Sequence, residues 1–134
     1  MNHTPIYITR EDNSKLRLLI STALYSSSTS TALRKLGDEL DRAAIVDLSG
    51  IPTGVVTMDS HVEFEDLATG EIEDYVITFP DRADVAQKRI SILAPIGTAL
   101  IGCREGDLVS WATPGGLRRL RVRRVLQSSL ALVP

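Results

Sequence analysis

Apolar residues in the first fifty positions recur at helical spacing in two stretches. Thr9 has the side chain of an N-cap, and the acids Glu11 and Asp12 follow it in the first turn, where the helix dipole favours negative charge. The first apolar stripe predicts a helix over about residues 10–24, and the second predicts a helix reaching about residue 44. The two stripes consist of Leu16, Leu19, Ile20, Ala23 and Leu24, and of Leu33, Leu36, Leu40, Ala43 and Ala44.

A run of hydroxyl side chains separates the two stripes. Two apolar-striped helices joined by a short polar loop pack as an antiparallel, coiled-coil-like hairpin. Each arm is about 22 Å long, and a pair of this size is marginal in water, so its base should rest on the rest of the protein. The predicted hairpin tip is Tyr25, Ser26, Ser27, Ser28, Thr29 and Ser30.

Beyond residue 50 the periodicity changes from helical to strand-like. Residues 47–54 are rich in glycine and proline, which is typical of a linker, and they divide the chain into a helical hairpin over residues 1–50 and a β domain over residues 51–134. Alternation predicts strands on either side of Thr69-Gly70. The alternation slips between Ile72 and Tyr75, which indicates a bulge or a strand buried on both faces.

The remaining pattern completes an α+β chain with an antiparallel β domain that carries one short helix. Pro95 suits the first turn of that helix, and Gly102 suits the position just after its end. Short strands are predicted over residues 90–93, around Val109 and Trp111, and over residues 117–126.

Charge is unevenly distributed, although the net charge is only −2. Nine acids and one base, Arg82, lie between Asp59 and Asp84, whereas five arginines and no acid lie between Arg118 and Arg124. Clustered arginines could contact phosphates, or neighbouring strands could set them opposite the acids. The acidic overall charge and the lack of aromatic residues among the arginines favour strand pairing. Direct nucleic-acid contact and DNA binding stay open, and we interpret the acids as a solvated face that protects a sheet edge.

The chain offers little for catalysis or metal binding. Its histidines are His3 and His61, and its one cysteine is Cys103, so no zinc-ligand spacing can be assembled. His61 could ligate a metal with neighbouring acids, but a surface histidine beside acids is the commoner arrangement. We expect no catalytic, cofactor or metal site, and we interpret Cys103 as a small filler of the core.

Sequence features also indicate the compartment. No apolar run approaches the roughly 18 to 20 residues that cross a bilayer, and the N-terminus does not resemble a secretory signal. A single cysteine fits a reducing compartment. We therefore expect a cytoplasmic monomer that has no membrane partner.

An ordered set of short motifs marks the second half of the chain. Residues 56–60 (VTMDS) precede the charged strands, and residues 91–102 (SILAPIGTALIG), Gly106-Asp107 and Pro114-Gly115-Gly116 follow them. This order resembles the C-terminal domain of the bacterial transcript-cleavage (Gre) factors, which implies an FKBP-like fold over about residues 55–126. Residues 36–43 and the short arms resemble one branch, the Rnk family, named as regulators of nucleoside diphosphate kinase.

The resemblance implies a mechanism with two departures. In Gre factors the C-terminal domain docks at the rim of the RNA polymerase secondary channel, while a long coiled coil reaches inward and two acids at its tip help to hold a catalytic magnesium. Here the arms are about half as long, and residues 25–31 contain no Asp or Glu. A hydroxyl cannot replace a carboxylate as a ligand of a hard cation. The expected protein is a non-enzymatic RNA polymerase-binding regulator that competes with Gre-type factors without stimulating transcript cleavage.

Loops of the β domain are the expected contact with polymerase. Two alternatives stay open: an FKBP-like prolyl isomerase, which needs an aromatic-lined pocket and is not implied by fold alone, and a direct protein partner of nucleoside diphosphate kinase, whose regulation we expect to be indirect. The candidate polymerase contacts are Pro95, Ile96, Gly97, Pro114, Gly115 and Gly116.

Overall fold

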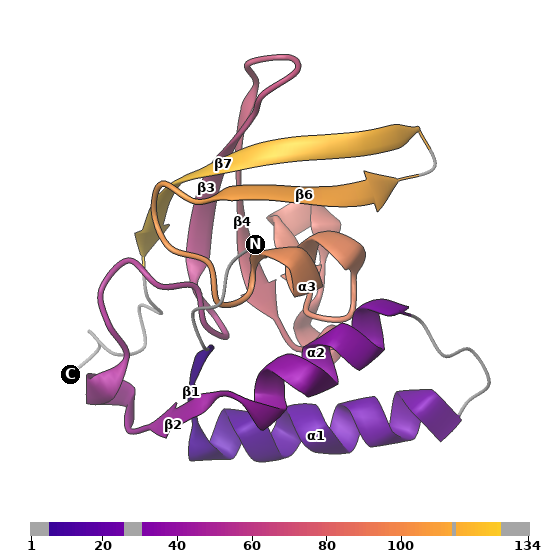
Figure 1. Ribbon diagram of the computed structural model, residues 1–134, viewed down its shortest axis with the longest axis vertical. Coiled ribbons are helices and arrows are strands. Elements are labelled where there is room, and N and C mark those ends of the chain that lie inside the picture. The colour runs from indigo at the N-terminus through magenta and orange to yellow at the C-terminus, as the bar shows by residue number, and fades with distance from the viewer. Residues whose placement is uncertain (1–5, 26–30, 114, 127–134) are drawn as a thin grey trace.

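The computed structural model describes residues 6–25, 31–113 and 115–126 (Figure 1). No helix within these ranges is both long enough and apolar enough to cross a membrane. The helices and strands follow in the order β1 Tyr7–Thr9, α1 Arg10–Tyr25, α2 Thr31–Asp41, β2 Ala44–Val46, β3 His61–Asp66, β4 Ile72–Thr78, β5 Arg89–Ser91, α3 Pro95–Leu100, β6 Leu108–Thr113 and β7 Gly116–Leu126.

The two N-terminal helices form the expected antiparallel pair. The Oγ1 atom of Thr9 accepts a hydrogen bond from the backbone N–H of Asp12 at 3.2 Å, which confirms the predicted N-cap of α1. Arg17, in the first half of α1, forms an ion pair with Asp41 at the end of α2, at 3.0 Å. Tyr25, the first residue of the predicted tip, is the last residue of α1, and the rest of the tip, residues 26–30, lies outside the described residues.

The second helix is shorter than predicted. It ends at Asp41, and Ala44, which we expected on its apolar face, begins strand β2. The backbone N–H of Ala44 donates to the carbonyl oxygen of Ile6 at 2.8 Å, and β2 pairs with β1 in parallel. This strand pairing replaces the last helical turn. Both strands have three residues, too few to show a periodicity.

The hairpin lies along the β domain. Leu16 and Ile20 of α1 and Leu36 and Leu40 of α2 are buried in the same apolar cluster as residues of the sheet such as Phe64. Figure 1 shows α2 between α1 and α3, and α2 and α3 are in contact. The hairpin therefore buries its apolar stripe against the domain rather than only at its base.

The main sheet has five strands among the described residues, in the order β5-β4-β3-β7-β6. Antiparallel pairing is confirmed between β3 and β4, β3 and β7, and β6 and β7. The prediction of an antiparallel β domain was wrong at one edge of the sheet, because β5 pairs with β4 in parallel. Residues 79–88, which include two short 3₁₀ turns, carry the chain back so that β5 runs in the direction of β4, as parallel neighbours require.

The bulge predicted between Ile72 and Tyr75 is not present on β4. The alternative, a strand buried on both faces, is met in part, because residues 73–76 are all partly buried and Ile77 and Thr78 are both buried. The register between β3 and β4 is continuous, and Ile72 is exposed on β4. A bulge instead interrupts the pairing of β3 with β7, where Glu63 lies opposite Arg124 and Phe64 opposite Val122. Arg123 is the extra residue. The bulge lets Val122 and Val125, three positions apart, both point into the core.

Glycine substitutions in α2 and α3 should have opposite effects on stability. A Cβ atom on Gly97 would lie 2.4 Å from the carbonyl oxygen of Ser91, so Gly97→Ala should lower the free energy of unfolding by about 1–3 kcal/mol. A Cβ atom on Gly37 would meet no atom within 4 Å, so Gly37→Ala should raise it by about 0.5–1 kcal/mol. Urea unfolding of both variants measures the two changes. An unchanged or raised free energy of unfolding in Gly97→Ala would contradict the close approach of α3 to Ser91, and a lowered one in Gly37→Ala would contradict the open space beside Gly37.

Candidate functional site

The residues predicted to contact polymerase lie at two places. Pro95 is exposed at the first position of α3, Ile96 is partly buried against the core, and Gly97 is buried. Gly115 and Gly116 are exposed where the chain enters β7, and Pro114 lies outside the described residues. The predicted contact role of these residues stays a prediction. Gly97 contributes close backbone packing instead of an exposed surface.

The VTMDS motif builds a buried turn. The backbone N–H of Thr57 donates to the Oγ atom of Ser60 at 2.9 Å, and the Oγ1 atom of Thr57 donates to the carbonyl oxygen of Tyr7 at 2.9 Å. Asp59 has a φ of 65°, which only a tight turn imposes on a residue with a side chain. The motif thus ties β1 to the β domain.

The second motif and the glycine after it also have structural roles. The Oγ1 atom of Thr98 donates to the carbonyl oxygen of Ile92 at 2.8 Å, and the backbone N–H of Leu93 donates to the Oγ atom of Ser91 at 3.0 Å. The backbone N–H of Gly106 donates to the carbonyl oxygen of Val122 at 2.7 Å. The quoted motifs therefore encode the architecture of the domain more than an exposed site.

Two of the clustered arginines are paired with acids across the sheet. Asp66, 5 % exposed, forms an ion pair with Arg118 and accepts hydrogen bonds from the backbone N–H groups of Ala68 and Thr69. The Arg118 guanidinium and these N–H groups hold the pKa of the Asp66 carboxyl below its usual range. The strand-pairing interpretation is confirmed for Arg118.

The bulge residue Arg123 is the second paired arginine. Its Nε atom lies 3.4 Å from Glu63 and its Nη1 atom lies 3.6 Å from Glu65. Our interpretation of these acids as protection for a sheet edge was wrong, because β3 is the central strand and the edges are β5 and β6. The acids instead face the arginines of the neighbouring strand.

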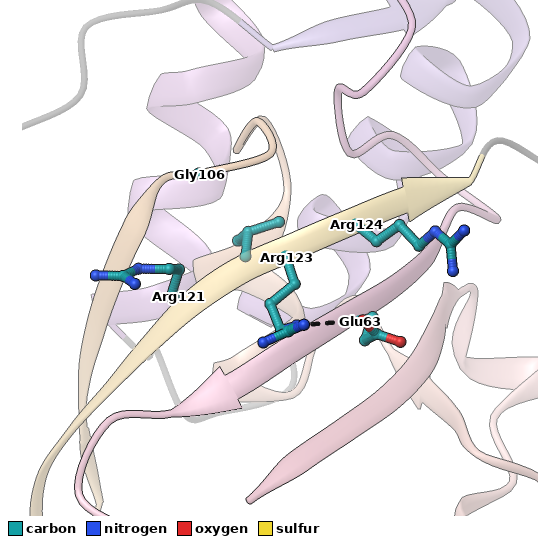
Figure 2. Close-up of a pocket in the computed structure, with 6 residues that line it drawn as sticks. Glu63, Gly106, Arg121, Arg123 and Arg124 are labelled. Atoms are coloured by element: carbon teal, nitrogen blue, oxygen red, sulfur yellow. Dashed lines mark hydrogen bonds and ion pairs between the residues drawn. The ribbon is translucent and has the colours of Figure 1, made fainter. Parts of the chain in front are cut away.

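Arg119, Arg121 and Arg124 are exposed and form no ion pair with any residue that the structure describes. Arg121 and Arg124 line a shallow groove of about 410 Å³ together with Glu63, Gly106, Val122 and Arg123. Figure 2 shows Arg123 turned toward Glu63, whereas Arg121 and Arg124 extend in opposite directions. The side chains do not converge on one point, so the groove does not have the geometry of a site for a small anion.

The surroundings of His61 and Cys103 do not favour metal binding or thiol chemistry. The Nε2 atom of His61 lies 2.6 Å from Asp74, and no group of three or more His, Cys, Asp or Glu side chains in the described part of the chain could hold a metal ion. Cys103 is buried, and burial raises the pKa of its thiol to about 12, which is the opposite of what a reactive cysteine needs.

The aromatic residues offer little to an isomerase. Phe64 and Phe79 are buried in the core, and Tyr75 stacks against Phe64 with ring centroids 5.9 Å apart. Trp111, which we placed in a predicted strand beside Val109, lies outside the described side chains.

Comparison with known proteins relates the first part of the chain to Rnk proteins and the second part to GreA/GreB elongation factors. The family described as "Transcription elongation factor, GreA/GreB, C-term" matches residues 51–127, and the family described as "Rnk N-terminus" matches residues 4–46. The regulator of nucleoside diphosphate kinase of Escherichia coli strain K12 is 32% identical over 87% of this chain and 85% of that protein. The transcription elongation factor GreA of Methylococcus capsulatus is 37% identical over 67% of this chain, but only 58% of that protein is covered.

Solved structures agree with the sequence matches. The prokaryotic transcription elongation factor GreA/GreB from Nitrosomonas europaea superposes with a TM-score of 0.76 at 35% identity, covering 90% of this chain and 97% of that one. The Gfh1 protein of Thermus aquaticus superposes with a TM-score of 0.51 at 27% identity, covering 91% of this chain and 98% of that one.

Removing the buried carboxylate should make the protein less sensitive to acid. Because the folded-state pKa of Asp66 is lowered, its ionised form stabilises the fold above the unfolded-state pKa of about 3.9, and this contribution is lost as the pH falls. Asp66→Asn should therefore lower the Tm at neutral pH and reduce the loss of Tm between about pH 5 and pH 3. Thermal unfolding at several pH values measures both effects. Asp81→Asn, at an exposed position with the same charge change, is the control, and equal curves for the two variants would contradict the role given to Asp66.

Proposed function

Because the chain belongs to the Rnk family, whose C-terminal half is a GreA/GreB C-terminal domain, we propose that it is a regulator of transcription that binds RNA polymerase. The observation that carries this proposal is the match of residues 51–127 to that domain. The superposition on a GreA/GreB elongation factor with a TM-score of 0.76 supports it. Such a partner implies a cytoplasmic location, and the protein acts as a monomer.

The proposed arrangement has a helical unit, residues 1–50, and a docking unit, residues 51–134. Docking takes place through the exposed start of α3 at Pro95 and the exposed turn at Gly115 and Gly116. In Gre factors the corresponding domain docks at the rim of the secondary channel. We expect this chain to occupy the same site and to exclude longer Gre-type factors from it.

Transcript cleavage is not part of the proposed function. Helix α1 has 16 residues and α2 has 11, which correspond to about 24 Å and 16 Å of helix. The segment between them, residues 26–30, contains only Ser and Thr, and hydroxyls do not supply the charged oxygen ligands that Mg²⁺ requires. The protein therefore occupies its site without catalysis.

The effect on nucleoside diphosphate kinase that the name of the E. coli relative reports is then indirect. A transcription regulator changes the amount of a kinase without touching it. Direct binding to the kinase is the second candidate, and the name of the relative supports it. A binding assay with the purified kinase distinguishes the two.

Binding to polymerase should depend on the start of α3. Purified protein should bind core RNA polymerase and be displaced by an excess of a GreA factor. Pro95→Glu should weaken binding at least about tenfold, because it places a charge and a longer side chain in the contact. Ala86→Glu, which adds the same side chain at an exposed position away from the proposed contact, is the control. Equal binding of both variants would refute the assignment of this contact, and binding to the kinase but not to polymerase would favour the second candidate.

The protein should not accelerate cleavage in a backtracked complex. Added to a stalled elongation complex with Mg²⁺, it should leave the rate of RNA cleavage at the intrinsic level and should slow the cleavage that an added GreA factor stimulates, because both compete for one site. Gel analysis of the labelled transcript measures both rates. Stimulated cleavage by this protein alone would refute the argument from the acid-free segment.

A further inference from the structure

The ribbon of β6 and β7 has an outer face that no described element covers. Side chains alternate across a strand, so Val109 and Leu120 point into the core while Leu108 and Arg121, which lie opposite each other in the register, point outward. Val109 and Leu120 belong to the same buried cluster as Leu36 of α2 and Leu100 of α3, so these helices lie on the inner side of the ribbon, and Figure 1 shows all three helices beyond β6. We call Leu108, Leu117, Arg119 and Arg121 the arginine–leucine surface.

The register shows which acids lie near these arginines. Strand β3 supplies the acids that pair with β7, and its last partner pair is Asp66 with Leu120. Beyond that pair the backbone N–H of Leu67 donates to the carbonyl oxygen of Arg119 at 3.0 Å, and from Arg118 to Gly116 strand β7 pairs with β6 alone. Arg119 is opposite Ser110, and Arg121 is opposite Leu108 on that side. On its other side Arg121 is opposite Glu65, which forms an ion pair with Arg123.

The apolar members of the surface are unusually exposed. Leu108 is 66% exposed and Leu117 is 62% exposed. From Leu117 to Arg121 the strand spans about 13 Å, so the four side chains form one patch of two leucines around two guanidinium groups. The patch continues directly from the exposed glycines of the 115–116 turn, which belong to the proposed polymerase contact.

The composition of the patch favours a protein partner over a nucleic acid. Every base in β7 is an arginine, and arginine is enriched at protein interfaces whereas lysine is depleted. Leucine has no charge or hydrogen-bond donor that could bind a phosphate. No aromatic side chain in the described part of the patch is available for a nucleic-acid base to stack on. A partner that complements this surface has carboxylates opposite the two arginines and apolar side chains opposite the two leucines.

We infer that the arginine–leucine surface binds an acidic, partly apolar segment of a protein partner, and that this partner is RNA polymerase. The inference rests on the proposed function and deepens it, because it assigns a second contact on the face of the sheet opposite α3. Arg119 and Arg121 pair with carboxylates of the partner, and Leu108 and Leu117 bury apolar side chains beside them. Carboxylate pairing of this kind accelerates association and weakens with salt.

Paired substitutions in the full-length chain test the inference against core RNA polymerase. The variant Arg119→Gln/Arg121→Gln removes two charges, and Leu108→Ser/Leu117→Ser removes the apolar groups. The control, Arg82→Gln/Arg89→Gln, makes the same charge change at exposed positions on and near the β5 edge. Affinity is measured at low and at physiological salt, and Tm is measured for every variant.

Both surface variants should bind polymerase about tenfold more weakly than the wild type, with Tm unchanged because the substituted side chains are exposed. The arginine variant should also show a shallower dependence on salt, whereas the control should bind like the wild type. Wild-type binding by both surface variants, or an equal loss in the control, would overturn the inference. Loss of binding to a DNA or RNA oligonucleotide with normal binding to polymerase would also overturn it, in favour of a nucleic-acid partner. Absence of binding by the wild type is a separate result, which would overturn the proposed function itself.

Discussion

The pairing of β3 with β7 is the constraint on which most of the structure depends. It sets Val62 and Phe64 against Val125 and Val122 on the inner face, where they form the centre of the core. The same register sets Glu63 and Glu65 beside Arg123 on the outer face. One pairing therefore determines both the apolar core and the charge pattern of the exposed face. Strand β7 extends beyond β3 at the end near the 115–116 turn. The acids of β3 therefore do not continue along that end of β7.

The second constraint is the shared burial of the hairpin and the sheet. Leu36 and Leu40 are 1% and 2% exposed and belong to the same cluster as Phe64. Fully burying a leucine stabilises a fold by about 1.5–3 kcal/mol, whereas an isolated helix pair of this size is marginal. The helices are therefore held by the β domain, and the hydrogen bond from Thr57 to Tyr7 fixes the chain where they begin. Short helices that pack along the β domain do not project far from it, in contrast to the long coiled coil of Gre factors.

Periodicity predicted the longer elements well and the short ones poorly. The helices α1 and α3 and the strands on either side of Thr69-Gly70 were predicted because each carries its own pattern or turn residues. Strands β1 and β2 were missed, since three residues show no period and their pairing depends on contacts between distant segments. The parallel direction of β5 and the bulge at Arg123 were missed for the same reason. Both are properties of a register, which a single strand does not reveal.

The candidate contacts illustrate a different limit. The sequence identified the five arginines as a group, but only the structure separates Arg118 and Arg123, which form ion pairs with acids, from Arg119 and Arg121, which form none with any described residue. Alternation along the strand places Leu117 on the same face as Arg119 and Arg121, but the sequence does not show that this face is left uncovered, because that depends on the packing of distant elements.

The residues that reveal the family and the residues proposed to contact a partner overlap only in part. Pro95, Gly115 and Gly116 belong to the family motifs and are exposed, whereas other motif residues are buried. Thr57, Ser60 and Gly97 carry the resemblance, and each is buried and holds backbone in place. Because the fold requires such buried residues, a match to them indicates a shared fold. A shared binding partner also requires that the exposed surfaces be alike. The second contact that we infer uses exposed side chains such as Arg119 and Leu117, which the motifs do not include. The pairing of β3 with β7 depends neither on the length of the helices nor on the exposed side chains of the sheet. The domain of an elongation factor can therefore be kept with shorter helical arms and with different side chains on its exposed face.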